Sequence, residues 1–217
     1  MKKNAVLINA PTSFMEVHVG ERKKTGEIFA YPPLGLLYLA STLEQRSISV
    51  SVIDAPSENL SVKEISHRID ETDPALIGIS ATSPQAKYAV TLAKEFRVRF
   101  PEAQIAVGGN HITLDRDFIK KYPYFDFCVA GEAEGIFPSL TEKVIAGEKL
   151  SGVFNGYPIS DLDSIPFPAR HLVKTEKYFM PIHGKRFTSI LSSRGCPYNC
   201  WFCSRPVVGR LMRFRSA

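Results

Sequence analysis

Short apolar runs, each followed by a stretch with helical spacing, recur five times between Ala5 and Ala146. The central run, Ala75–Ser80, has no charged interruption, as expected of a parallel strand that is buried on both faces. Strands that alternate with helices pair in parallel through right-handed crossovers. The sequence therefore predicts an α/β fold built on an open five-stranded parallel sheet.

The same pattern sets the expected domain organisation. The expected strands are residues 5–9, 47–54, 75–80, 104–107 and 125–130, and the expected helices begin near Pro33 and cover 62–69, 83–100, 113–122 and 135–146. This flavodoxin-like or Rossmann-like domain spans residues 1–147. A linker with several prolines and acidic residues, 148–185, leaves the sheet. Residues 186–217 then start with a strand, 186–192, that leads into a cysteine loop.

Composition excludes several classes of protein. The 217 residues are 44% hydrophobic and 23% charged, as in an ordinary globular protein. The longest apolar stretch, around 34–40, is too short to span a bilayer, and we expect a cytoplasmic protein. The net charge of +5 comes from residues 185–217, which hold seven basic and no acidic residues. We do not expect nucleic acid as a partner, and we interpret this local charge as serving anionic ligands or acidic residues outside this chain.

Small and polar residues cluster where the expected strands end, in 9–12, 80–82, 108–111 and 131–135. In open α/β sheets, ligands bind at the carboxyl ends of the strands. The sequence therefore predicts a ligand site at this edge. A dinucleotide with Asp54 on its ribose is one candidate, but the loop after the first strand lacks the G-x-G-x-x-G phosphate cradle.

Cys196, Cys200 and Cys203 have the spacing C-x3-C-x2-C. Three thiolates on one loop can hold three corners of a cubane iron–sulfur cluster, which a fourth thiolate normally completes. No cysteine follows Cys203, so one iron stays open for a small ligand. Zinc with His183 or His171 as fourth ligand is an alternative, although zinc sites usually pair two close-spaced couples. Cys128, in an apolar run, is interpreted as a buried thiol.

This cysteine loop resembles the radical S-adenosylmethionine (SAM) superfamily. The resemblance implies that the amino and carboxylate groups of SAM bind the open iron of a [4Fe–4S] cluster held by Cys196, Cys200 and Cys203. It also implies that Phe202 lies against the adenine of SAM.

The segments 31–36, 73–80, 107–113 and 131–134 look like the cobalamin-binding domain that precedes this loop in cobalamin-dependent radical SAM proteins. These include methyltransferases and magnesium-protoporphyrin ester cyclases. The resemblance implies that the dimethylbenzimidazole tail of cobalamin enters beside the third strand and that the corrin ring lies over the strand ends. The implied contact residues are Thr12, Pro33, Leu34, Ser80, Thr82, Gly108, Gly109, His111, Gly131 and Glu132.

The sequence departs from the cobalamin domains of methionine synthase and the mutases at one point. Their D-x-H-x-x-G histidine binds cobalt, whereas the loop after the second strand here, 54–59, contains no histidine. We expect cobalt without a histidine ligand from this loop, with His111 lining the ring edge or capping the next helix. Methylthiotransferases of the superfamily bring three further cysteines, but the first 195 residues contain only Cys128.

The resemblance implies a parent enzyme that cleaves SAM reductively to drive methyl transfer or ring cyclisation on a small-molecule substrate, with ferredoxin or flavodoxin as reductant. Its catalytic residues are not identified by the sequence. A radical SAM barrel needs roughly two hundred residues, with site loops from several strands, and this chain ends 14 residues after Cys203. We therefore expect a truncated barrel that is inactive alone. The alternative is a non-catalytic cofactor-binding module with a structural zinc or iron–sulfur loop.

Overall fold

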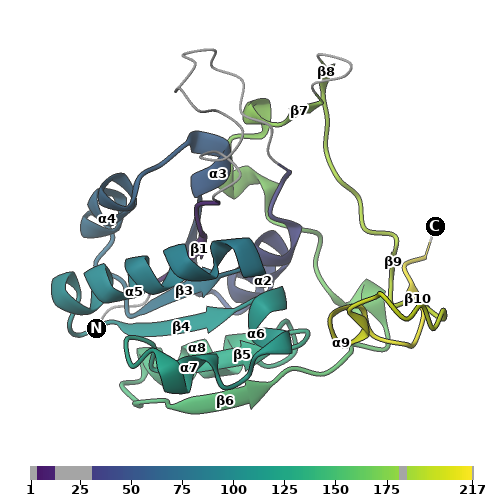
Figure 1. Cartoon of the computed structure of the whole chain (residues 1–217). Coiled ribbons are helices and arrows are strands. Elements are labelled where there is room, and N and C mark those ends of the chain that lie inside the picture. The colour runs from purple at the N-terminus through teal and green to yellow at the C-terminus, as the bar shows by residue number, and fades with distance from the viewer. Residues whose placement is uncertain (1–3, 13–30, 181–184, 217) are drawn as a thin grey trace.

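The computed structural model of the chain describes residues 4–12, 31–180 and 185–216. A six-stranded parallel sheet with the order β2-β1-β3-β4-β5-β6 forms its centre (Figure 1). Its strands are β1 (Asn4–Asn9), β2 (Ser49–Asp54), β3 (Leu76–Ser80), β4 (Gln104–Gly108), β5 (Phe127–Ala130) and β6 (Gly152–Asn155). The predicted α/β class and flavodoxin-like order are confirmed, with one strand added at the edge.

Helices cover both faces of the sheet. The helices are α2 (Leu34–Gln45), α3 (Ala55–Glu58), α4 (Val62–Asp70), α5 (Ala86–Arg99), α6 (Asn110–Leu114), α7 (Phe118–Lys121), α8 (Phe137–Ile145) and α9 (Arg205–Val208), with 3-10 turns at Ser83–Gln85, Leu162–Ser164, Arg170–Leu172 and Thr175–Lys177. The apolar side chains of α2 and α8 pack on one face, and those of α4, α5, α6 and α7 pack on the other. The domain therefore has three layers with two apolar cores. No helix of the described chain is long and apolar enough to cross a membrane.

Side-chain alternation along β1 explains why both faces are buried. Val6 and Ile8 belong to the core under α4 and α5, whereas Ala5 and Leu7 belong to the core under α2 and α8. Successive side chains of a strand point to opposite faces, so a strand in the middle of such a sheet reads as one continuous apolar run.

The sheet has six strands, so the prediction of five was wrong. The additional strand β6 pairs in parallel with β5 and lies within the stretch that the sequence assigned to the linker. It has four residues at the open edge of the sheet, where its side chains alternate between half-buried and exposed. Phe154 packs edge-on against Phe127, with ring centres 5.6 Å apart. A short, half-exposed edge strand lacks the apolar run that identified the others.

The helix expected over residues 113–122 is two short helices, α6 and α7. The chain leaves the helical conformation at Asp115, which ends α6 with φ −120° and ψ 83°. The Asp115 carboxylate accepts a hydrogen bond from Lys121 at 2.8 Å and one from the backbone N–H of Asp117. Aspartate competes with helix formation through local hydrogen bonds, which accounts for the break.

The strand expected over residues 186–192 does not form at that length. Residues 185–186 form β8 (Lys185–Arg186), which pairs with β7 (Phe179–Met180), and the next pairing is between β9 (Ser193–Arg194) and β10 (Arg213–Phe214). A strand exists through hydrogen bonds to a neighbour, and most of 187–192 has no strand beside it among the described residues.

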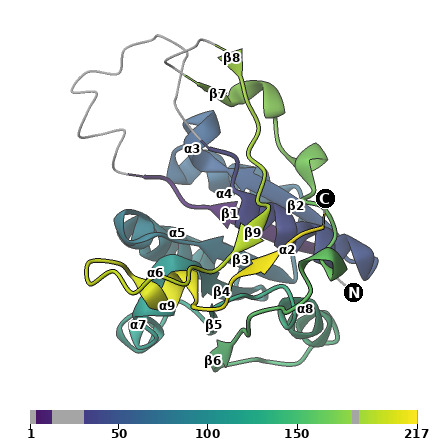
Figure 2. The ribbon, with the colours of Figure 1, turned by 90° about the vertical axis from the view of Figure 1, so that its right-hand side faces the viewer.

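The segment that carries the cysteines crosses the carboxyl ends of the central strands. Figure 2 looks onto this edge and shows β9, β10 and α9 in front of the sheet, with α9 beside α6. The aromatic side chains of Tyr198, Trp201 and Phe202 are exposed on it. The two parts of the chain that the sequence identified as cofactor sites therefore meet at one edge of the molecule.

Candidate functional site

A cavity of about 570 Å³ opens at the carboxyl ends of β1, β3, β4 and β5, beside α2 and α8. Most of its wall comes from the α/β domain. The remainder comes from the C-terminal segment, which contributes Leu191, Arg194 and Val207. The expected position of a ligand site at the carboxyl edge of the sheet matches this cavity.

The floor of the cavity is a trough of small side chains on the sheet face that α2 and α8 cover. Gly78, Ala106 and Gly108 line it on the neighbouring strands β3 and β4, and Leu7 and Phe137 line it from either side. The small size of Gly78 makes room for neighbouring side chains, because a Cβ atom there would lie 2.9 Å from Leu7 Cδ2 and 3.5 Å from Phe137 Cζ. The floor of the cavity is therefore apolar and close to the backbone of β3 and β4.

A tight backbone contact shapes the rim of the trough. Gly109 has φ +98°, and a Cβ atom there would lie 2.8 Å from the carbonyl oxygen of Ala81. Only glycine adopts this conformation without strain. The loop after β4 thus keeps close to β3 and leaves the mouth of the cavity open.

Eight of the ten residues that were predicted to contact cobalamin line this cavity. They are Pro33, Leu34, Ser80, Thr82, Gly108, Gly109, Gly131 and Glu132. They come from four separate loops of the sequence, and the parallel sheet brings them together because its strands all end at one edge. Their contacts with a ligand remain a prediction.

The other two predicted residues, Thr12 and His111, are not among the cavity-lining residues. His111 lies in the first turn of α6, where its Nδ1 is 3.1 Å from Ser83 Oγ and its ring packs edge-on against Phe118. Its side chain makes no capping hydrogen bond to α6, so the capping role was wrong. Thr12 is half-buried at the end of the described first segment.

A chain of hydrogen-bonded polar side chains runs along the ends of the strands. Tyr178 donates to Asp54 Oδ2 at 2.7 Å, and Asn9 donates to Asp54 Oδ1 at 2.7 Å. Gln85 Nε2 donates to Asn9 Oδ1 at 2.9 Å, and Gln85 Oε1 accepts from the backbone N–H and the hydroxyl of Thr82 at 2.9 and 2.7 Å. This chain connects the cavity, which Asn9, Gln85 and Thr82 line, with the segment that leaves the sheet.

Sequence reasoning missed Gln85 as a cavity residue and named Asn9 only as part of the strand-end segment 9–12. The signal for Gln85 was present, because Thr82 and Gln85 have the T-x-x-Q spacing of a capping box, and the structure forms one there. The signal for Asn9 was its place at the end of the first strand. Their long-range partners, by contrast, have no sequence signature.

The environment of Asp54 excludes the ribose-binding role that the dinucleotide alternative gave to it. Asp54 is 2% exposed, and its two carboxylate oxygens accept hydrogen bonds from Tyr178 and Asn9. Burial raises the pKa of the Asp54 carboxyl, although both hydrogen bonds act in the opposite direction. A ribose has no access to this carboxylate.

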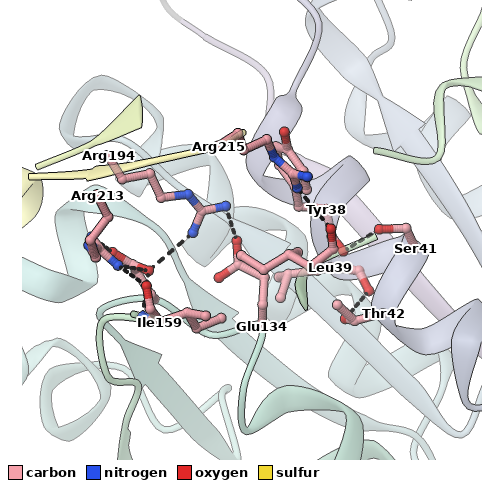
Figure 3. A network of polar contacts seen from close by, with 11 residues as sticks. Tyr38, Leu39, Ser41, Thr42, Glu134, Ile159, Arg194, Arg213 and Arg215 are labelled. Atoms are coloured by element: carbon pink, nitrogen blue, oxygen red, sulfur yellow. Dashed lines mark hydrogen bonds and ion pairs between the residues drawn. The ribbon is translucent and has the colours of Figure 1, made fainter. Parts of the chain in front are cut away.

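Two glutamates in the loop after β5 hold the C-terminal segment. Arg194 donates to Glu134 at 2.6 Å (Figure 3) and to Glu132 at 3.2 Å. Arg213 donates to both oxygens of Glu132. The backbone N–H of Ile159 donates to Glu132 at 3.2 Å. Burial alone would raise the pKa of Glu132, but the hydrogen bond from Arg213 and the nearby charges hold it below its usual range. The Glu132 carboxylate thus binds Arg194 and Arg213 and thereby holds the C-terminal segment.

The partners of the basic C-terminal segment lie within this chain, and the interpretation that they lie outside it was wrong for three arginines. Arg194 and Arg213 pair with the glutamates after β5, and Arg215 lies 4.0 Å from Asp163. Sequence separation hid these pairs, because Arg213 and Glu132 are 81 positions apart.

The cysteine loop lies between β9 and α9. The Cys196 side chain is half-buried, and those of Cys200 and Cys203 are exposed, as is Phe202. Within residues 4–12, 31–180 and 185–216, no three His, Cys, Asp or Glu side chains are close enough together to hold a metal ion. Three thiols within eight residues fit an iron–sulfur cluster in donor chemistry, but the loop does not gather them.

The structure also defines the surroundings of Cys128 and of His171. Cys128 is fully buried, as predicted, and burial raises its pKa to about 11. His171 pairs with Glu44 at 2.8 Å, so the structure does not support it as a zinc ligand beside the cysteines. His183 lies outside the described residues.

Comparison with protein families matches residues 29–141 to the B12 binding domain. An uncharacterized methyltransferase of Pyrococcus horikoshii is 34% identical over 188 residues, which cover 80% of this chain and 40% of that protein. The anaerobic magnesium-protoporphyrin IX monomethyl ester cyclase of Rubrivivax gelatinosus is 29% identical over 208 residues, which cover 85% of this chain and 37% of that protein. The chain thus spans about 40% of the length of these relatives.

Solved structures share the fold along the whole chain. The cobalamin-dependent SAM radical enzyme OxsB, with aqua-cobalamin and SAM bound, superposes with a TM-score of 0.75 at 19% identity over 99% of this chain and 30% of that one. The radical SAM methyltransferase TsrM from Kitasatospora setae, with cobalamin and a [4Fe–4S] cluster bound, gives 0.69 at 18% identity over 100% of this chain and 44% of that one.

Proposed function

The chain belongs to the B12-binding domain family, and from this premise we propose that it binds cobalamin in the cavity at the carboxyl edge of its sheet, as part of a cobalamin-dependent radical SAM enzyme. The observation that carries the proposal is the trough of small residues beneath the cavity, at Gly78, Ala106 and Gly108. The trough has the position and the apolar character that the dimethylbenzimidazole tail requires.

The residues of this chain have separate tasks in the proposal. The trough receives the tail between the sheet and the helices, and Leu7 and Phe137 exclude water from it. Pro33 and Leu34, at the start of α2, line the cavity near the proposed corrin position. Thr82 is held in place by its hydrogen bonds to Gln85.

The loop after β2 offers cobalt no histidine ligand. The residues after β2 form the short helix α3. Asp54, which precedes α3, is hydrogen-bonded to Asn9 and Tyr178. His111 is committed to Ser83 and Phe118. Because the proposed position of the tail keeps dimethylbenzimidazole away from cobalt, we expect a base-off form, and we expect no histidine ligand from the loop after β2.

For the complete enzyme, the proposal adds a [4Fe–4S] cluster on Cys196, Cys200 and Cys203, with Phe202 against SAM. The cluster, SAM and cobalamin would supply radical chemistry and a methyl or redox partner, leading to methyl transfer or cyclisation of a small-molecule substrate, with a one-electron donor such as ferredoxin or flavodoxin. The protein's part is to bring the cysteine loop and the cavity to one edge of the fold. Both curated relatives described above, a methyltransferase and a cyclase, agree with this range of reactions.

The test is an anaerobic titration of the chain with hydroxocobalamin, followed by visible spectroscopy and gel filtration. We expect stoichiometric co-elution and a base-off spectrum. Ala106→Leu places a larger side chain in the trough and should weaken binding by roughly tenfold or more, which corresponds to about 1.4 kcal/mol. Ala146→Leu is the matched control, because Ala146 is exposed at the end of α8.

Two results would overturn the assignment. The first is no binding by the unaltered chain at tens of micromolar, and the second is a base-on spectrum with equal affinity in both leucine variants. Thermal unfolding of Ala106→Leu shows whether the fold persists. Anaerobic reconstitution with iron and sulfide then separates the enzyme from a structural zinc module, because the enzyme predicts an oxygen-sensitive brown cluster and the module predicts bound zinc.

A further inference from the structure

The α/β domain and the C-terminal segment both line the cavity. Leu191 and Arg194 come from the C-terminal segment, and the α/β domain supplies most of the rest. A ligand that fills the cavity therefore touches both parts. Arg194 is also two residues before Cys196, the first cysteine of the loop. The position of one side chain links the cavity to the cysteine loop.

Four charged side chains fix this position. Arg194 and Arg213 face each other across the β9–β10 pair, so both guanidinium groups point to the loop after β5. There they bind Glu132 and Glu134, and Figure 3 shows Arg194 directed at Glu134. Three of the side chains are nearly withdrawn from water, with exposed fractions of 4% for Arg213, 7% for Glu134 and 13% for Arg194, and Glu132 is 21% exposed. Two negative and two positive charges balance one another.

Helix α2 adds a second contact to the same group. The guanidinium carbons of Arg194 and Arg215 lie 5.2 and 5.5 Å from the centre of the Tyr38 ring, in the range of cation–π contacts. Tyr38 is 4% exposed and itself lines the cavity. Arg215 also donates to the carbonyl of Ile165 at 2.8 Å. The arginines thus bridge the loop after β5 and the helix on the other side of the cavity.

We propose that Glu132, Glu134, Arg194 and Arg213 form a positioning clamp that couples filling of the cavity to docking of the cysteine loop. The inference rests on the proposed function, because cobalamin is the ligand through which the coupling acts. A buried ion pair adds little net stability but is strongly destabilising when one partner is removed, which makes the docked geometry specific. Coupling is reciprocal, so a ligand that contacts the docked segment must favour docking, and docking must favour the ligand.

The test compares Glu134→Gln with the unaltered chain by hydrogen exchange and mass spectrometry of peptides from residues 189–216, with and without hydroxocobalamin. The matched control is Glu148→Gln, because Glu148 forms an exposed pair with Lys143 at 3.7 Å. We expect Glu134→Gln to speed exchange in 189–216 by about tenfold or more, while peptides of β3 and β4 keep their protection. Hydroxocobalamin should slow exchange in 189–216 of the unaltered chain.

The affinity for hydroxocobalamin tests whether ligand binding is coupled to docking of residues 189–216. By reciprocity, Glu134→Gln should weaken hydroxocobalamin binding by roughly three- to thirtyfold, and Glu148→Gln should leave it unchanged. Unchanged exchange in Glu134→Gln overturns the clamp. Faster exchange with unchanged affinity overturns the coupling and leaves the proposed function standing. No binding by the unaltered chain overturns the proposed function and the coupling together, whereas the exchange rates without ligand still decide whether the four residues hold the segment.

Discussion

The hydrogen bond between Tyr178 and Asp54 allows a quantitative prediction about stability. The phenol donates to Asp54 Oδ2 at 2.7 Å, and the two side chains are 1% and 2% exposed. A hydrogen bond to a charged group contributes about 1.5–3 kcal/mol net. Tyr178→Phe removes this donor while the ring is retained, so the free energy of unfolding should fall by that amount. The melting temperature should fall by about 3–12 °C, because each kcal/mol corresponds to about 2–4 °C in a chain of this size.

The pH dependence of this loss gives a second readout. The pKa of Asp54 is raised in the folded state, and Tyr178→Phe raises it further because the phenol favours the charged form. The native variant then retains its proton to higher pH than the unaltered protein. The cost of the substitution should therefore be smallest in acid, where Asp54 is protonated in both proteins, and should grow as pH rises through the folded pKa values.

The assay is urea unfolding followed by circular dichroism between pH 4 and 8. Tyr157→Phe is the control, because Tyr157 is exposed and its substitution should change stability by less than about 0.5 kcal/mol. In an Asp54→Asn background the effect of Tyr178→Phe should shrink. The reasoning is refuted if Tyr178→Phe behaves like the control, or if its cost is the same in Asp54→Asn and at every pH.

Three further predictions follow from other parts of the structure. Gly195→Ala should loosen residues 189–216 to proteolysis while the melting temperature of the sheet is kept, because Gly195 has φ +95° and a Cβ atom there would overlap the Leu211 carbonyl; an unchanged digestion pattern would contradict this. The hydrogen bond from Arg68 lowers the pKa of Glu58 to about 2, so stability should be lost as pH falls from about 4.5 to 2, and Glu58→Gln should flatten that slope in urea titrations. Before any cluster is loaded, three thiols should react with Ellman's reagent at pH 8 and Cys128 should react only on unfolding, whereas four fast thiols would disprove its burial.

The strands in the middle of the sheet were predictable because burial on both faces leaves an uninterrupted apolar run, as in Ala75–Ser80. The edge strand β6 was not, since its exposed side removes that signal. The break between α6 and α7 depends on the non-helical backbone conformation of Asp115, and the spacing of apolar residues gives no sign of it. Pattern thus predicted the layers, whereas ends and edges depended on tertiary contacts.

The candidate site shows the same division. Strand-end loops were predictable because parallel strands end at one edge, and eight of ten predicted contacts line the cavity. Glu132 was found for its position, but its carboxylate binds arginines of the C-terminal segment. Tyr178 and Asp54 are 124 positions apart in the sequence, and no local sequence pattern predicts a contact between residues so far apart.

The cavity of about 570 Å³ at the carboxyl edge also means that the fold leaves part of its apolar surface uncovered. Leu34 and Leu39 line the cavity and are only half-buried, and unfilled space beside a core costs stability. The ligand then acts as the missing core material. A ligand that binds only the folded state stabilises it by about 2.7 kcal/mol when the free ligand concentration is about one hundred times the dissociation constant. Supply of the cofactor would therefore control how much of this protein persists in a cell, because the empty form is the one that unfolds and is degraded.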